Sequence, residues 1–213
     1  MNALVDPILV LIMLLNFFVL ATSRVRAVIT ASAAQGLLLG ALPVLVQPHP
    51  GVVPVLMALG TMAVKAAVIP WMLLRALREA AIRREVEPLV GYIPSLFLCA
   101  LGTALALLFA RTLPLAAAHS ASLIIPGAFA TVLTGFLVLT TRRKALTQVA
   151  GYLILENGIF IMGLLLVEAM PLLVEIGVLL DLLVGIFVMG IIINHINREF
   201  SSLDTSHLSS LRE

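Results

Sequence analysis

The chain consists of long apolar runs separated by short polar connections, a pattern that predicts an all-α protein with seven membrane-spanning helices. Runs of about 19–23 residues are long enough to cross a hydrocarbon layer of about 30 Å with modest tilt. Proline and glycine inside the runs are compatible with helix, because a backbone in lipid must satisfy its hydrogen bonds internally. The predicted spans are Leu4–Thr22, Ala27–Val46, Val52–Leu74, Val90–Ala110, Ala121–Thr141, Ala145–Val167 and Leu172–Asn194.

The composition indicates a polytopic membrane protein with little mass outside the bilayer. Of the 213 residues, 62% are hydrophobic and 11% are charged, whereas soluble domains have about 45–50% apolar and about 25% charged residues. The formal net charge is +2, so no large basic surface indicates a nucleic-acid partner. The single cysteine, Cys99, lies in an apolar run, where we expect it to pack, and one thiol cannot supply a zinc or iron–sulfur ligand set. We therefore expect no bound metal or cofactor.

The positions of the cations predict how the chain crosses the membrane. Eleven of the 13 Lys and Arg residues fall on one side of the predicted spans, Arg111 falls on the other side, and Lys65 lies inside the third span. Because cytoplasmic connections carry an excess of Lys and Arg, we expect the N-terminus outside and the C-terminus in the cytoplasm, in the cell inner membrane. We also expect a four-helix membrane segment at 1–111, a three-helix segment at 121–197 and a cytoplasmic polar tail at 198–213.

Four ionisable side chains lie inside the predicted spans, where a charge is costly and a functional role is the default interpretation. They are Lys65, Glu156, Glu175 and Asp181. Glu156 lies about 17 Å and Asp181 about 20 Å from the cytoplasmic ends of two successive antiparallel spans, and Lys65 lies at a similar depth. Acidic and basic groups at one depth can exchange protons laterally, so we expect these residues to form a proton-transfer path.

Each of these residues also has a structural interpretation. A buried charged side chain can hold two helices together through hydrogen bonds, although a neutral Asn or Gln serves that purpose at lower cost. Glu175 lies close enough to the outer boundary to reach lipid headgroups. His195, flanked by Asn194 and Asn197 at the inner boundary, is a candidate for a cytoplasmic proton entry or an ordinary interfacial side chain.

The residues around the buried charges predict part of their surroundings. Phe160 lies four residues after Glu156 and shares its helix face, whereas Asn157 points about 100° away from that carboxylate. Pro70 follows Lys65 by five residues and cannot donate a backbone hydrogen bond, which predicts a kink near this lysine.

The last three predicted spans carry a recognisable combination of features. The run IIPGAFATVLTGFLVLTTRRKALTQVAGYLILENGIF resembles the K-type subunit of respiratory complex I and the C-type subunit of multisubunit cation/proton antiporters. In that family a helix ends in a basic doublet, the next carries a glycine and then a mid-membrane Glu, and a third carries a second acid. The first two features are matched by Arg142, Arg143, Gly151 and Glu156, and Asn157 matches the Asn or apolar residue that follows the Glu in that family. Asp181 stands where the third-helix acid of the respiratory subunit is usually Glu.

The four additional N-terminal spans depart from this three-helix pattern. The longer layout, with the ending NHINREFSSLDTSHLSSLRE, resembles component E of hydrogenase-4 and related formate hydrogenlyase-type complexes. The resemblance implies a non-catalytic membrane-arm subunit of a complex-I-like [NiFe]-hydrogenase, whose buried carboxylates join a lateral proton path. Its implied partners are the lipid bilayer, antiporter-like and other membrane subunits and, indirectly, the soluble hydrogenase module. Two alternatives remain, a subunit of a cation/proton antiporter without a redox partner and a structural spacer.

Overall fold

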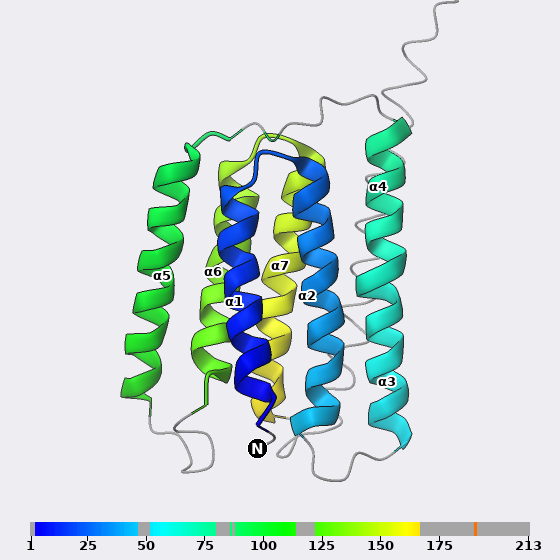
Figure 1. Cartoon of the computed structure of the whole chain (residues 1–213), viewed down its shortest axis with the longest axis vertical. Helices are drawn as coiled ribbons and strands as arrows, with labels where there is room; N and C mark the ends of the chain where they lie inside the picture. The colour runs from blue at the N-terminus through cyan, green and yellow to red at the C-terminus, as the bar shows by residue number, and fades with distance from the viewer. Residues whose placement is uncertain are drawn as a thin grey trace, which may run out of the picture.

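The fold is that of a computed structural model, which describes residues 3–46, 52–79, 86, 88–113, 122–166 and 190. These residues form helices and, within these ranges, no β-strand. The elements are α1 (Val5–Ala21), α2 (Val25–Val46), α3 (Val52–Met62), the π-helix η1 (Ala63–Val68), α4 (Ile69–Glu79), α5 (Tyr92–Thr112), α6 (Ile124–Thr141), α7 (Ala145–Gly163) and the 3-10 turn η2 (Leu164–Leu166). The α3, η1 and α4 elements follow one another without a break and form one rod (Figure 1).

The predicted all-helical architecture is confirmed, and the chain is a multi-pass membrane protein. Five described helices are long and apolar enough to cross a membrane, and α1 is a shorter apolar helix of 17 residues. The five are Val25–Val46, Ala58–Arg78, Tyr92–Thr112, Ile124–Thr141 and Ala145–Gly163. Apart from Gly190, the predicted span Leu172–Asn194 lies outside the described residues, so the count of seven stays a prediction.

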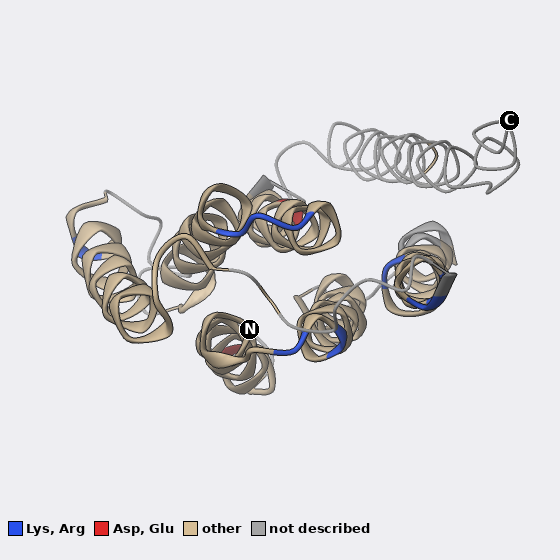
Figure 2. Ribbon diagram, turned by 90° about the horizontal axis from the view of Figure 1, so that it is seen from above, with Lys and Arg blue, Asp and Glu red and all other residues tan. Residues whose placement is uncertain are grey.

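The helices stand in two rows (Figure 2). One row contains α5, α6 and α7, and the other contains α1, α2 and the rod made of α3, η1 and α4. Across the rows, α1 packs against α5 and α6, and α2 packs against α7, while the rod packs against α2. The α1–α2 and α6–α7 connections and the end of α4 lie together at the upper end of the bundle in Figure 1.

Small residues bring α6 and α7 close together, as in membrane helix pairs, where association depends on close packing. A Cβ atom added at Gly158 would lie 2.5 Å from the backbone nitrogen of Val132 on α6. A Cβ atom added at Gly151 would lie 2.7 Å from the backbone nitrogen of Leu139. Only glycine fits at these two positions, so α7 is held against the backbone of α6 along most of its length.

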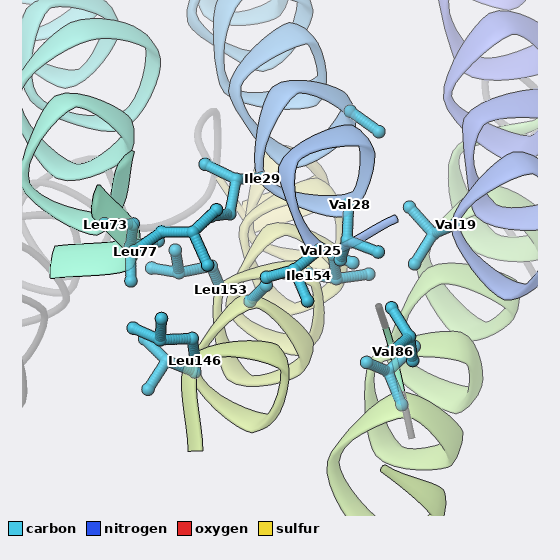
Figure 3. Close-up of a cluster of buried hydrophobic side chains, with 14 of the residues drawn as sticks. Val19, Val25, Val28, Ile29, Leu73, Leu77, Val86, Leu146, Leu153 and Ile154 are labelled. Carbon is cyan, nitrogen blue, oxygen red and sulfur yellow. The ribbon is translucent and has the colours of Figure 1, made fainter. Parts of the chain in front are cut away.

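Two apolar clusters fill the bundle, one in each half. The upper cluster lies near the cationic connections and includes Val19, Val25, Ile29, Leu73, Leu146, Leu153 and Ile154 (Figure 3). The lower cluster lies toward the other end and includes Leu9, Ile12, Leu39, Leu42, Ile124, Ala128 and Ile161. The buried polar side chains described in the next section lie between the two clusters.

Arg142, in the connection between α6 and α7, is buried and fastens the upper end of the bundle. Its guanidinium donates hydrogen bonds to the carbonyl oxygens of Leu20 (3.1 Å) and Val90 (3.4 Å) and lies 5.4 Å from the centre of the Tyr92 ring. Leu20 belongs to the last turn of α1, where carbonyls lack intrahelical partners and a cation is favourable. Burial lowers the pKa of this guanidinium, and Tyr92 opposes that effect. Its neighbour Arg143 is exposed instead.

The α6–α7 contact leads to a test of packing. We expect Gly158→Ala to lower the unfolding temperature in detergent by several degrees, because overpacking costs about 1–3 kcal/mol. Gly60→Ala is the matched control, since a Cβ atom added there meets nothing within 4 Å and alanine favours helix. Equal unfolding temperatures for the two variants would contradict the close approach of α6 and α7.

Candidate functional site

Six buried polar side chains form a layer between the upper and lower apolar clusters, which we call the polar layer. They are Asn16 on α1, Gln35 on α2, Lys65 on η1, Thr131 on α6, and Glu156 and Asn157 on α7. The relative exposure of each residue is 8% or less. On α1, α2, α6 and α7 the polar residue lies between members of the two clusters: on α1, for example, Asn16 lies between Ile12 of the lower cluster and Val19 of the upper cluster. The polar layer therefore crosses the bundle at one depth.

The centre of the polar layer is an ion pair between Lys65 and Glu156. The Nζ atom of Lys65 lies 3.7 Å from Oε2 of Glu156. The same ammonium donates a hydrogen bond of 3.5 Å to Oδ1 of Asn157 and lies 5.8 Å from the centre of the Phe160 ring. Glu156 and Asn157 point in different directions around α7, yet the Lys65 side chain contacts both.

The backbone around Lys65 departs from the α-helical pattern by a π-helical segment, which the sequence did not predict; the kink expected from Pro70 stays a prediction. Residues Ala63–Val68 form a π-helix, and the N–H of Ile69 donates to the carbonyl of Val64, five residues earlier. Pro70 lies inside the continuous rod, two residues after the end of the π-helical segment, and it has no N–H to donate to a carbonyl of that segment. Single π-helical turns inside α-helices occur frequently at functional sites.

Gly36 on α2 allows the helix to approach Lys65 closely. A Cβ atom added at Gly36 would lie 2.9 Å from Cβ of Lys65 and 3.0 Å from its carbonyl carbon. The preceding residue, Gln35, is fully buried at this contact between α2 and the rod. The lack of a side chain at Gly36 therefore helps to bring the lysine beside the polar residues of α2 and α7.

A chain of side-chain hydrogen bonds leads away from the ion pair. Asn157 Nδ2 donates to Gln35 Oε1 at 3.5 Å, and Gln35 Nε2 donates to Asn16 Oδ1 at 2.8 Å. Asn16 Nδ2 donates to the hydroxyl oxygen of Thr131 at 3.0 Å, and this hydroxyl donates to the carbonyl of Gly127 at 2.7 Å. The chain passes from α7 through α2 and α1 to α6, and we call it the amide chain.

The structure brings together two of the predicted site residues, Lys65 and Glu156. Glu175, Asp181 and His195 lie outside the described residues, so their part in the site stays a prediction. The prediction missed Asn16, Gln35 and Thr131. Their signal is an uncharged polar side chain inside an apolar run, as in the segment LLNFF around Asn16. Within the described part of the chain, no three His, Cys, Asp or Glu residues are placed to hold a metal ion.

Comparison with known proteins gives one extensive match. The chain is 37% identical over 193 residues to the uncharacterized protein Rv0085 of Mycobacterium tuberculosis, which corresponds to 88% of this chain and 86% of that protein. The chain belongs to the family of that protein. No family model and no solved structure matches it.

A second group of relatives matches this chain over a shorter stretch. The chain is 35% identical over 80 residues to hydrogenase-4 component E of Escherichia coli, and the same values hold for Shigella flexneri. The alignment covers 38% of this chain and 37% of component E, so the chain matches little more than a third of that relative. This supports a distant relationship to component E.

The buried ion pair can be tested by a double-mutant cycle. We expect Lys65→Met to lower the free energy of unfolding by about 3–5 kcal/mol, because the buried carboxylate then loses its ammonium partner. In Lys65→Met/Glu156→Gln the loss should be clearly smaller than the sum of the two single losses, since both charges are gone. Unfolding of the purified chain in detergent measures each value.

Lys144→Met serves as the control, because this lysine lies in the α6–α7 connection and not in the polar layer. We expect it to change the free energy of unfolding much less than Lys65→Met does. Strict additivity of the Lys65 and Glu156 substitutions would show that the two side chains do not interact.

Proposed function

We propose that the chain is a seven-span subunit in the membrane arm of a complex-I-like [NiFe]-hydrogenase of the hydrogenase-4 or formate hydrogenlyase type. In this proposal it lies in the cell inner membrane with its N-terminus outside and its C-terminus in the cytoplasm. Its direct partners are antiporter-like and other membrane subunits, and the redox chemistry takes place elsewhere in the complex. Its own task is to pass protons laterally through the polar layer.

The observation that carries the proposal is the ion pair of Lys65 and Glu156, buried between two apolar clusters. Removing two charges from water costs several kcal/mol each, and neutral side chains could hold the helices at lower cost. A retained acid and base in contact are therefore better explained by a need for groups that gain and lose protons.

The energy that proton transfer requires is within the range of such a site. Moving one charge across a potential of 100 mV takes about 2.3 kcal/mol, and a change of one pKa unit corresponds to about 1.4 kcal/mol. A change of charge in a neighbouring subunit would therefore suffice if it altered proton affinity in the polar layer by about two pKa units.

In the proposed sequence of steps, a proton reaches the Glu156 carboxylate and weakens its attraction to Lys65. The proton then moves on to Asp181, which the proposal places at the same depth on the seventh span. Glu175 extends the path toward the outer face, and His195 is the candidate for entry from the cytoplasm. Lys65 returns Glu156 to its charged form by stabilising the carboxylate when the proton has left.

The relationship to component E favours a hydrogenase over the two alternatives, an antiporter without a redox partner and a structural spacer. The alignment over 80 residues, at 35% identity, links the chain to a protein named as component E of hydrogenase-4. The hydrogenase assignment and the proton path are separate claims, so the test examines them separately.

For the first claim, the full chain is tagged in its own organism and purified from membranes in mild detergent with its partners. We expect nickel and iron in the purified complex, together with hydrogenase activity. A stable complex without nickel and without a redox-active subunit would contradict the hydrogenase assignment and favour the antiporter.

For the second claim, proton uptake into inverted membrane vesicles is followed with a pH-sensitive dye while the complex turns over. We expect Glu156→Gln to lower proton uptake per turnover at least about tenfold, since proton transfer through a positioned group contributes about 10²–10⁴-fold. Glu79→Gln, which removes a carboxylate at the end of α4, is the matched control. Normal assembly with unchanged proton uptake in Glu156→Gln would contradict the proton path and favour the role of a structural spacer.

A further inference from the structure

The rod formed by α3, η1 and α4 has two different faces in its upper half. One face is buried and carries Lys65, Ile69, Leu73 and Leu77, the last three of which belong to the upper cluster. Figure 3 shows Leu73 and Leu77 among the other side chains of that cluster. Through this face the rod is joined to the rest of the bundle, where it packs against α2.

The other face changes from apolar to cationic along the rod, and we call it the exposed face. Its residues are Val68, Trp71, Arg75 and Arg78, which follow one another at intervals of three or four and therefore share one side of the helix. All four are exposed, and the relative exposure of Trp71 is 61%. The arginines lie at the upper end of the rod, the end that also carries the basic α1–α2 and α6–α7 connections (Figure 2).

The order of residues on the exposed face matches the order of chemical groups in a phospholipid. Helix rise places Arg75 about 6 Å and Arg78 about 10 Å above Trp71 along the rod. Tryptophan is enriched at the level of the lipid headgroups, so the two arginines reach the level of the phosphates. A guanidinium group binds phosphate oxygens with two parallel hydrogen bonds. Val68 lies on the other side of Trp71, where acyl chains begin.

Charge and location both favour a lipid as the occupant of the exposed face. The α4 helix carries two arginines and one acid, Glu79, so it keeps a net positive charge that an anionic headgroup complements. The Arg75 guanidinium lies 5.8 Å from the centre of the Trp71 ring, a cation–π contact that keeps both groups on this side of the rod. Because the segment Ala58–Arg78 is long and apolar enough to cross a membrane, its exposed face is turned toward lipid and not toward a water-soluble partner.

We infer that the exposed face of the rod is a binding site for an anionic phospholipid. Arg75 and Arg78 bind the headgroup phosphate, and an acyl chain lies along Trp71 and Val68. The inference is independent of the proposed function. It has a consequence for the polar layer, because Lys65 lies on the opposite face of the same rod. A lipid bound at the exposed face holds the rod at one depth in the membrane and so keeps this lysine level with its partner on α7.

The chain has a single tryptophan, so the fluorescence of Trp71 reports directly on the lipid at this face. The full chain is reconstituted in phosphatidylcholine vesicles that contain an increasing fraction of one lipid with brominated acyl chains, which quench an indole in contact with them. That lipid is either phosphatidylglycerol, which is anionic, or phosphatidylcholine, whose phosphate is compensated by its own ammonium. The two titrations give the binding constant of phosphatidylglycerol relative to phosphatidylcholine. Each value compares two lipids in one protein variant, so changes in intrinsic fluorescence cancel.

We expect the wild-type chain to bind phosphatidylglycerol at least about fivefold more tightly at Trp71, the contribution of about one arginine near an anionic surface. Arg75→Gln/Arg78→Gln should bring the relative constant close to one. Arg75→Lys/Arg78→Lys should retain most of the preference, since both charges remain. Arg24→Gln/Arg26→Gln is the matched control, because it removes two exposed arginines from the same end of the bundle but from the start of α2. It should leave the relative constant unchanged.

Equal quenching of wild-type Trp71 by the two lipids would overturn the inference and favour contact with a partner protein at this face. Equal losses of preference in the two glutamine pairs would also overturn it, since they would indicate a general attraction between the cationic end of the bundle and anionic lipid. Neither result bears on the proton uptake of Glu156→Gln, which tests the proposed function by itself.

Discussion

The ion pair between Lys65 and Glu156 constrains the rest of the bundle, because a charge in an apolar interior must be compensated by groups within reach. The two side chains come from different rows of helices, which fixes the rod containing η1 against α7 and α2 at one depth. The ammonium then requires acceptors, which orients Asn157 and, through it, the remaining amides. The register of three further helices, α2, α1 and α6, thus follows from one pair of charges.

The apolar parts of the bundle accommodate this polar layer and do not drive helix association by themselves, since lipid is as apolar as leucine. Close packing supplies the stability instead. Glycines bring α7 against α6 and α2 against η1, and the buried Arg142 satisfies carbonyls at the upper end. The π-helical turn at Ala63–Val68 gives Lys65 a backbone that differs from the regular helices around it. Rigid packing around one irregular turn is a suitable setting for side chains that must keep a defined geometry.

Hydropathy and helix rise were sufficient to predict the helical fold, the five helices long enough to cross a membrane, and the shared depth of Lys65 and Glu156. The π-helical segment Ala63–Val68 was not predicted, because the position of Pro70 indicates only that one backbone hydrogen bond is lost nearby. The sequence could not reveal the amide chain, since Asn16, Gln35 and Thr131 come from three helices whose mutual rotation depends on tertiary packing. In the sequence, Arg142 does not differ from the other cations between predicted spans. Its burial depends on carbonyls at the end of α1 and before α5, which the fold brings together around it.

The whole bundle is arranged around a lysine and a glutamate whose charged groups are in contact in its interior. The most direct measurement is the dipolar coupling between the ¹⁵N ζ-nitrogen of Lys65 and the ¹³C-labelled carboxyl carbon of Glu156 in lipid vesicles, with Glu156→Gln to assign the signal. We expect a coupling that corresponds to direct contact, with the Lys65 nitrogen and the Glu156 carboxylate oxygen 3.7 Å apart. An ammonium signal without any coupling to the Glu156 carboxyl carbon would contradict this contact.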